Sequence, residues 1–312
     1  MVLCVCPNPA VDTYWWLDDL AKAGVNRILK EENFPGGKGT HVAMAIAELG
    51  EEVALLGFWA GNEGLWIKEE CDKKNVRCFG TILPEGNNRK CITVRSIKKT
   101  IENTEFLGAG PVISQQNYDA FFQEYLQLLN EAEVVVFSGS WPKGAPVDAY
   151  GSMIGAANSR VKKAWIDCSG TLLLLSLSHN PYGVHLNKTE AEEIVTNEKA
   201  ENYFLEFVRE LALTNGSEGL YLYNYHTQVH AMCKPEKIYS SVGSGDFLVA
   251  GLAIATLKKY STLKTAGLAT AAGGANCMRE ELGMLYRGDV NELLKKVIIK
   301  KIYNDHQKRI KV

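Results

Sequence analysis

The sequence has few of the features that mark membrane, secreted or nucleic-acid-binding proteins. No apolar run approaches the about 18 residues that span a bilayer, and residues 1–6 lack the length and the basic flank of a signal peptide. A formal net charge of −2 over 312 residues gives no overall attraction to nucleic acid or to an anionic membrane. We therefore expect a cytoplasmic protein whose partners are neither nucleic acids nor membranes.

Cysteine pairs and clusters are also missing. None of the eight cysteines forms a Cys-x-x-Cys pair, and no His/Cys group has the spacing of a zinc site. This pattern favours small buried thiols in a reducing compartment, and it excludes a disulfide scaffold.

What is present is an alternation of short apolar runs with helical periodicity. The runs that predict strands are residues 2–6, 53–57, 134–137, 164–166 and 184–186, with a hairpin over 220–223 and 228–232. Helices are predicted over 37–49, 118–129 and 246–257, and a solvated surface helix over 295–312. This order is typical of an α/β fold, a three-layer doubly wound arrangement around a mostly parallel sheet.

Two segments interrupt this alternation. Residues 11–34 and 87–107 carry more charge and more alternating side chains, and we interpret both as antiparallel strands of a small β-sheet lid. Residues 1–10, 35–86 and 108–312 would then form the α/β core that binds nucleotide and substrate.

The strongest local motif is Gly243-Ser244-Gly245-Asp246, which opens the apolar helix. The glycines allow a tight turn whose backbone N–H groups, together with the helix dipole, form an anion site. Asp246 there can simply cap the helix, or it can serve as the base beside a transferring phosphoryl group. The motif alone leaves the two interpretations about equal.

Three further motifs are weak by themselves. Pro35–Thr40 is a glycine-rich helix entry with one lysine, and it is not a Walker A loop because Gly39 separates Lys38 from Thr40. Asn187-Lys-Thr-Glu190 follows a strand and either caps the next helix or meets Mg²⁺ at the sheet edge. Leu213–Gly219 is predicted as a turn between a helix and a strand, over which a nucleotide could lie.

Taken in order, these residues resemble the PfkB (ribokinase-like) carbohydrate kinases, and most closely the 1-phosphofructokinase and tagatose-6-phosphate kinase branch. The resemblance spans nearly the whole chain. The matching segments are Pro7–Asp12, Val25–Arg27, Pro35–Gly39, Asn88–Arg89, Thr104–Glu105, Gly110–Pro111, Ser138–Gly144, Asp167–Gly170, Asn187–Glu190 and Gly243–Asp246. Each is modest alone, but ten in the right order are specific.

The resemblance implies a role for each matched residue. Asp246 would be the base, and Gly243, Ser244 and Gly245 would form the anion hole. The residues implied to bind the sugar or its phosphate are Asp12, Arg27, Gly37, Lys38, His41, Arg89, Ser138 and Ser140. Those implied to bind ATP are His185, Asn187, Thr214, Gly216, Gly219 and Asn276, with Asn187 and Glu190 organising Mg²⁺ through water. The resemblance also implies a homodimer that pairs through the lid.

Three positions depart from the branch. His41 stands where the branch has Asn, His185 replaces a lysine expected near the ATP phosphates, and Leu107 replaces a polar lid residue.

The expected function is therefore ATP-dependent phosphorylation of a sugar phosphate: fructose 1-phosphate, fructose 6-phosphate or tagatose 6-phosphate. A kinase for an unphosphorylated sugar or nucleoside, and a catalytically weak ligand sensor on the same fold, are the alternatives. A nicotinamide dehydrogenase is excluded, because Cys6-Pro-Asn-Pro9 follows the first strand where a glycine-rich dinucleotide fingerprint would stand.

Overall fold

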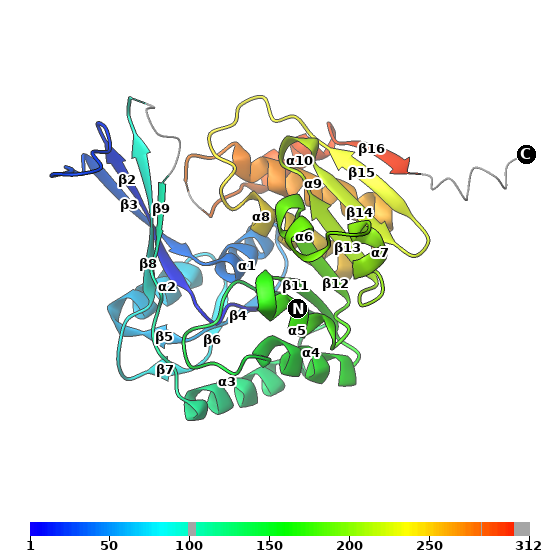
Figure 1. The fold of residues 1–312 in the computed structure, drawn as a ribbon, viewed down its shortest axis with the longest axis horizontal. Helices are drawn as coiled ribbons and strands as arrows, with labels where there is room; N and C mark the ends of the chain where they lie inside the picture. The colour runs from blue at the N-terminus through cyan, green and yellow to red at the C-terminus, as the bar shows by residue number, and fades with distance from the viewer. Residues whose placement is uncertain (99–103, 282, 303–312) are drawn as a thin grey trace, which may run out of the picture.

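A ten-stranded sheet forms the centre of the computed structural model, which describes residues 1–98, 104–281 and 283–302 (Figure 1). Its order is β16-β15-β14-β13-β12-β11-β10-β1-β4-β6. Within this order, all neighbouring strands from β13 through to β6 pair in parallel. The pairs β13–β14, β14–β15 and β15–β16 are antiparallel. Their bounds are β1 Val2–Val5, β4 Val53–Leu56, β6 Arg77–Phe79, β10 Val134–Ser138, β11 Lys163–Asp167, β12 Gly183–Asn187, β13 Glu210–Thr214, β14 Leu220–Asn224, β15 Gln228–Met232 and β16 Ile298–Ile302.

Helices cover both faces of this sheet, which confirms the predicted three-layer α/β fold. One face packs against α1 (Lys38–Glu48), α2 (Gly61–Asp72), α8 (Ser244–Leu257), α9 (Thr262–Cys277) and α10 (Arg287–Leu294). The other face packs against α3 (Gln115–Leu128), α4 (Ala149–Ser159), α5 (Gly170–Leu177), α6 (Lys188–Ile194) and α7 (Ala200–Phe204). Strands β1 and β10 are unbroken apolar runs because they are buried on both faces.

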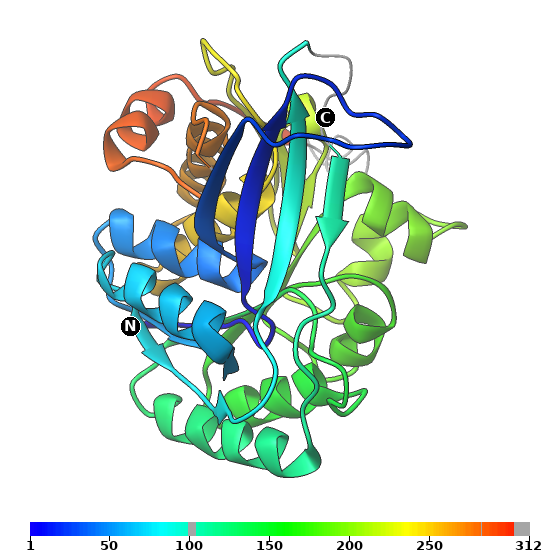
Figure 2. The same ribbon diagram turned by 90° about the vertical axis from the view of Figure 1, so that its left-hand side faces the viewer.

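A second, four-stranded sheet lies at the left of the main sheet in Figure 1, and Figure 2 shows its strands side by side. Its order is β3-β2-β8-β9, with bounds Lys30–Gly36, Ala10–Leu17, Arg89–Ser96 and Thr104–Leu107. Two short strands, β5 (Trp59–Ala60) and β7 (Ile82–Leu83), pair in parallel as a separate two-stranded sheet. We call the four-stranded sheet the lid sheet.

The register of the lid sheet places chemically important residues on one face. Asp12 pairs with Cys91, and Cys91 pairs with Leu107. Arg89 lies two residues before Cys91 on the same strand, so its side chain shares the face of Asp12. We call this face the inner face.

Three sequence predictions were wrong in detail. The lid strands are not all antiparallel, since β2 and β8 pair in parallel. The turn before Gly219 joins two strands, because Glu210–Thr214 pairs with β12 as β13. The predicted C-terminal helix contains strand β16, whose exposed Lys300 and Lys301 suit an edge strand beside β15, while residues 303–312 lie outside the described part.

No helix among the described residues has the length and apolar character needed to cross a bilayer.

Candidate active site

Most of the predicted site residues gather where the main sheet meets the lid sheet, whereas Arg27 and Asn276 lie apart from them. Lys38 is the first residue of α1, Asp246 lies in the first turn of α8, and three neighbouring parallel strands end at Ser138, Asp167 and Asn187. The carboxyl edge of an open parallel sheet is where ligands bind in this architecture, because loops and helix N-termini converge there.

His41 links the lid sheet to helix α8. Its Nδ1 lies 2.8 Å from Asp246 Oδ2, and its Nε2 lies 3.1 Å from Asp12 Oδ2. The side chains of His41, Asp246 and Asp12 are 6%, 8% and 14% exposed. Three segments distant in the sequence thus place an imidazole between two carboxylates in a nearly water-free setting.

The charges in this triplet depend on one another. Burial alone would lower the pKa of His41, but hydrogen bonds and charge from Asp12 and Asp246 outweigh burial and raise that pKa to about 10. Burial raises the pKa of Asp246, while His41 and Lys38 act against that rise. His41 is therefore an imidazolium at neutral pH.

The turn before α8 has the predicted shape. Gly243 is left-handed, with φ of 81°, and it is the N-cap residue of the helix without a side-chain cap. The carboxylate of Asp246 meets His41 across the site, so capping does not account for its orientation. The N–H groups of Ser244 and Asp246 donate to Ser241 O and Gly243 O, so an anion at this turn would compete with those bonds.

A second charged cluster lies next along the sheet edge. Asp167 Oδ1 accepts from Lys38 Nζ at 3.3 Å and lies 2.9 Å from His185 Nδ1. His185 Nε2 lies 3.3 Å from Thr214 Oγ1. Burial alone would raise the pKa of Asp167, but Lys38 and His185 lower it to about 2. Asp167 is therefore ionised and holds both neighbouring side chains at the edge.

Asn187 and Glu190 form a capping box at the start of α6. Asn187 Oδ1 accepts from the Glu190 N–H, and Glu190 Oε2 accepts from the Asn187 N–H, both at 2.9 Å. The capping interpretation of this motif is correct, and both oxygens remain at the exposed end of β12. The described residues contain no group of three or more His, Cys, Asp or Glu side chains that could hold a metal ion.

The residues predicted to meet the sugar phosphate lie in two places. Ser138 is fully buried, Ser140 Oγ accepts from Asn8 Nδ2 at 3.5 Å, and Arg89 Nε donates to Asn8 O at 3.2 Å. Arg27, by contrast, lies exposed in the segment between β2 and β3. The structure therefore gathers Arg89 with the serines but leaves Arg27 outside this group.

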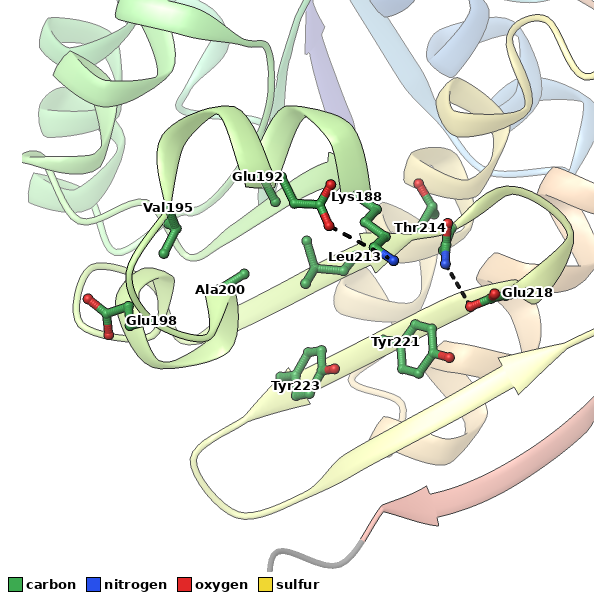
Figure 3. Close-up of a pocket in the computed structure, with 12 residues that line it drawn as sticks. Lys188, Glu192, Val195, Glu198, Ala200, Leu213, Thr214, Glu218, Tyr221 and Tyr223 are labelled. Atoms are coloured by element: carbon green, nitrogen blue, oxygen red, sulfur yellow. Dashed lines mark hydrogen bonds and ion pairs between the residues drawn. The ribbon is translucent and has the colours of Figure 1, made fainter.

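A cavity of about 320 Å³ adjoins the end of β13 (Figure 3). It is lined by Lys188, Ala191, Glu192, Val195, Glu198, Ala200, Leu213, Thr214, Asn215, Glu218, Tyr221 and Tyr223. The 3₁₀ turn Gly216–Glu218 and the left-handed Gly219 follow directly. Asn276 lies apart from this cavity, buried on α9, where its Nδ2 donates to Met284 O at 2.9 Å.

The comparisons with known proteins decide the family. The sequence profile of the pfkB family of carbohydrate kinases matches residues 11–284. The chain belongs to the pfkB family. Its members are ATP-dependent sugar kinases, which agrees with the predicted enzyme class.

Solved structures share this fold. Phosphofructokinase-2 from Escherichia coli, solved with substrates and products, is 21% identical with a TM-score of 0.87, over 94% of this chain and 98% of that chain. The possible 1-phosphofructokinase from Thermotoga maritima is 21% identical with a TM-score of 0.83, over 97% of this chain and 99% of that chain. The E. coli enzyme has also been solved in a tetrameric inhibited form.

Two positions of this pfkB protein contribute to the site without having been predicted. Asp167 was seen only as part of a matching motif, although its place at the end of a strand could have marked it. At Gly36, a Cβ would lie 2.1 Å from the Asp12 carboxyl carbon, so only glycine lets that carboxylate sit against β3. Its sequence signal was the glycine pair Gly36-Gly37.

Proposed function

We propose that the protein transfers the γ-phosphoryl group of ATP to a hydroxyl of a sugar phosphate, with fructose 1-phosphate, fructose 6-phosphate and tagatose 6-phosphate as the candidates. The observation that carries this proposal is the buried Asp246 carboxylate, which lies in the first turn of α8 and contacts His41, a residue that also contacts the lid residue Asp12. A carboxylate at a helix N-terminus, beside a glycine turn, combines a base with an anion site.

The chemistry assigns a task to each group. Asp246 accepts the proton of the acceptor hydroxyl as its oxygen bonds to phosphorus and the bond to the ADP oxygen breaks. The turn Gly243–Gly245 stabilises the charge of the transferring group. Asp12, Gly37 and Lys38 face the sugar, whereas His41 lies against Asp12 and Asp246. Two buried polar atoms at the same edge, Ser138 Oγ and Asn8 Oδ1, have no hydrogen-bond partner among the described residues and can pair with a polar ligand.

ATP would lie along the edge formed by His185, Asn187, Thr214, Gly216 and Gly219, with Asn276 acting indirectly from α9. Mg²⁺ bound to the phosphates takes few protein oxygens and keeps several waters, so the exposed oxygens of Asn187 and Glu190 suit water-mediated contact. The ion would neutralise the charge of the phosphates during transfer.

Arg89 is the group that favours a phosphorylated acceptor. It lies on the inner face of the lid sheet and contacts Asn8 beside Ser140, and a guanidinium can bind phosphate bidentately. Two observations favour a neutral sugar or nucleoside instead: Arg27 lies outside the group, and Leu107 presents an apolar side chain, 68% exposed, on the inner face. The third alternative, a catalytically weak ligand sensor, has less support, because a protein that only binds its ligand does not need a buried carboxylate base such as Asp246.

The Asp246→Asn variant tests the proposed reaction. Purified wild type with Mg²⁺ and ATP is expected to form ADP and a doubly phosphorylated product with at least one of the three sugar phosphates. The variant should lose about 10²–10⁴-fold in kcat, because the amide cannot accept the hydroxyl proton. Its ATP affinity, measured by calorimetry, should change little.

Fructose, ribose and nucleosides complete the panel. If only these neutral acceptors are phosphorylated, the substrate is an unphosphorylated sugar or nucleoside, and the proposed mechanism with Asp246 as base remains. ATP binding without turnover of any acceptor would favour the sensor, and full activity of the variant would remove Asp246 from the mechanism.

The pair Arg89→Met and Lys90→Met tests recognition of the substrate phosphate. The two residues are neighbours on β8, so their side chains point to opposite faces of the lid sheet. Arg89→Met should raise KM for the phosphosugar about 10–100-fold, because a hydrogen bond between charged groups is lost. Lys90→Met removes the same charge and should leave KM within about twofold. Equal effects of both variants would show that Arg89 makes no specific phosphate contact.

We also propose a cytoplasmic homodimer that pairs through the lid. All eight cysteines are unpaired thiols, which suits a reducing compartment. Large apolar side chains are exposed on or beside the lid sheet, namely Val25, Ile28, Leu29, Ile97, Phe106 and Leu107. A second copy of the chain would cover them from water.

Sedimentation equilibrium tests the pairing. The wild type should be dimeric at micromolar concentration, and Phe106→Glu should shift it toward monomer because a charge would be buried in the interface. Val147→Glu, at an even more exposed apolar residue just before α4, is the control and should stay dimeric. A monomeric wild type would contradict the proposal.

A further inference from the structure

His41 is enclosed by three other parts of the chain, namely β2, α8 and the loop at Gly283. Asp12 approaches from β2, Asp246 from α8, and the Phe247 ring stacks 6.2 Å away at an interplanar angle of 20°. Gly283 covers the remaining side so closely that a Cβ there would lie 2.5 Å from His41 Cδ2. The close packing on these sides restricts movement of the imidazole.

Both ring nitrogens face carboxylate oxygens. A neutral imidazole has one N–H and one lone pair, so one of the two carboxylates would face a lone pair. Nδ1 makes a hydrogen bond with Asp246, whereas Nε2 lies 3.1 Å from Asp12 Oδ2 without hydrogen-bond geometry. Two carboxylate oxygens within 3.1 Å of one buried ring favour a positive charge on His41 by proximity.

Resting on the proposed kinase function, we propose that His41 is a positioning residue whose positive charge keeps Asp246 ionised and occupies its Oδ2, so that Oδ1 receives the proton of the acceptor hydroxyl. His41 is one of the positions at which the sequence departs from the branch that its motifs resemble. Its role here differs from the sugar contact that the resemblance implies, because Nδ1 hydrogen-bonds with Asp246 and Nε2 lies 3.1 Å from Asp12 Oδ2.

The charged groups around His41 determine what the loss of its positive charge would do. Asp12 and Asp246 face His41 directly, Lys38 acts on Asp246 from α1, and Asp167 acts on it from β11. Without the imidazolium, two buried carboxylates share the site, and like charges at short range hold a proton to higher pH. Asp246 would then be protonated, and inactive as a base, over a wider acid range.

The first test is the pH dependence of kcat at saturating ATP and sugar phosphate for wild type and His41→Asn. The acid limb of the variant should move to higher pH by about 1–3 units. Activity should recover toward the wild-type value above that limb, because Asp246 is then ionised again. His41→Gln provides a second neutral variant if the first folds poorly.

The matched control is His179→Asn. His179 Nε2 lies 3.0 Å from Asp148 Oδ2, a His–Asp pair away from the site whose side chains are 32% and 38% exposed. Its acid limb should coincide with that of the wild type. A uniform fall of kcat at all pH values in His41→Asn, with no shift of the limb, would overturn the proposal and leave His41 a packing role.

A second readout does not depend on turnover. The pKa of His41 is raised from 6.5 to about 10, so its contribution to stability is fully present below pH 6.5 and is lost as pH rises through about 10. The stability difference between wild type and His41→Asn, from urea unfolding, should therefore shrink between these two pH values. A stability difference independent of pH would contradict a positive charge on His41. If the stability difference shrinks as expected and no sugar is phosphorylated, the proposed function fails, but the charged contact of His41 with Asp12 and Asp246 is supported.

Discussion

The arrangement of the site depends on one buried contact, the His41 side chain held between Asp12 and Asp246. Burying a carboxylate without a partner is strongly unfavourable, and burying two of them side by side is worse. A single imidazolium offsets both charges and joins the lid sheet to the start of α8. The bare backbone of Gly36 allows Asp12 to reach this position. The placement of the lid sheet over the core is therefore coupled to the charge state of the site.

The second cluster continues this pattern along the sheet edge. Asp167 holds Lys38 from α1 and His185 from β12, and His185 contacts Thr214 at the end of β13. The polar side chains thus extend from the lid to the turn expected to meet the nucleotide. Lys38 keeps 41% of its side chain exposed, so its ammonium is paired and still accessible to a ligand. A substrate anion approaching this edge would meet a cation that is already oriented.

Much of this could be predicted from the sequence because the signals are local. Apolar runs such as 134–137 predicted strands, and glycines beside Asp246 predicted a turn at the start of α8. Which strands pair with each other depends on residues far apart in the sequence, so a local pattern does not reveal it. For that reason the sequence analysis did not predict the parallel pairing of β2 with β8 or the strand at residues 298–302.

The site was predictable to a similar degree. Most of its residues lie at strand ends or helix starts, which a sequence pattern reveals. The double contact of His41 was not predictable, because it needs β2, α1 and α8 to be placed in three dimensions. Arg27 shows the opposite case, since a matching motif did not bring it to the site.

The protonation state of His41 tests the central claim most directly. Protein labelled with ¹⁵N at its six histidines can be followed by NMR from about pH 6 to about pH 9, with His41→Asn used to assign the signal. The account predicts that both His41 nitrogens stay protonated across this range, since the pKa is raised to about 10. Loss of a proton with a midpoint near 6.5, the ordinary pKa of histidine, would contradict it.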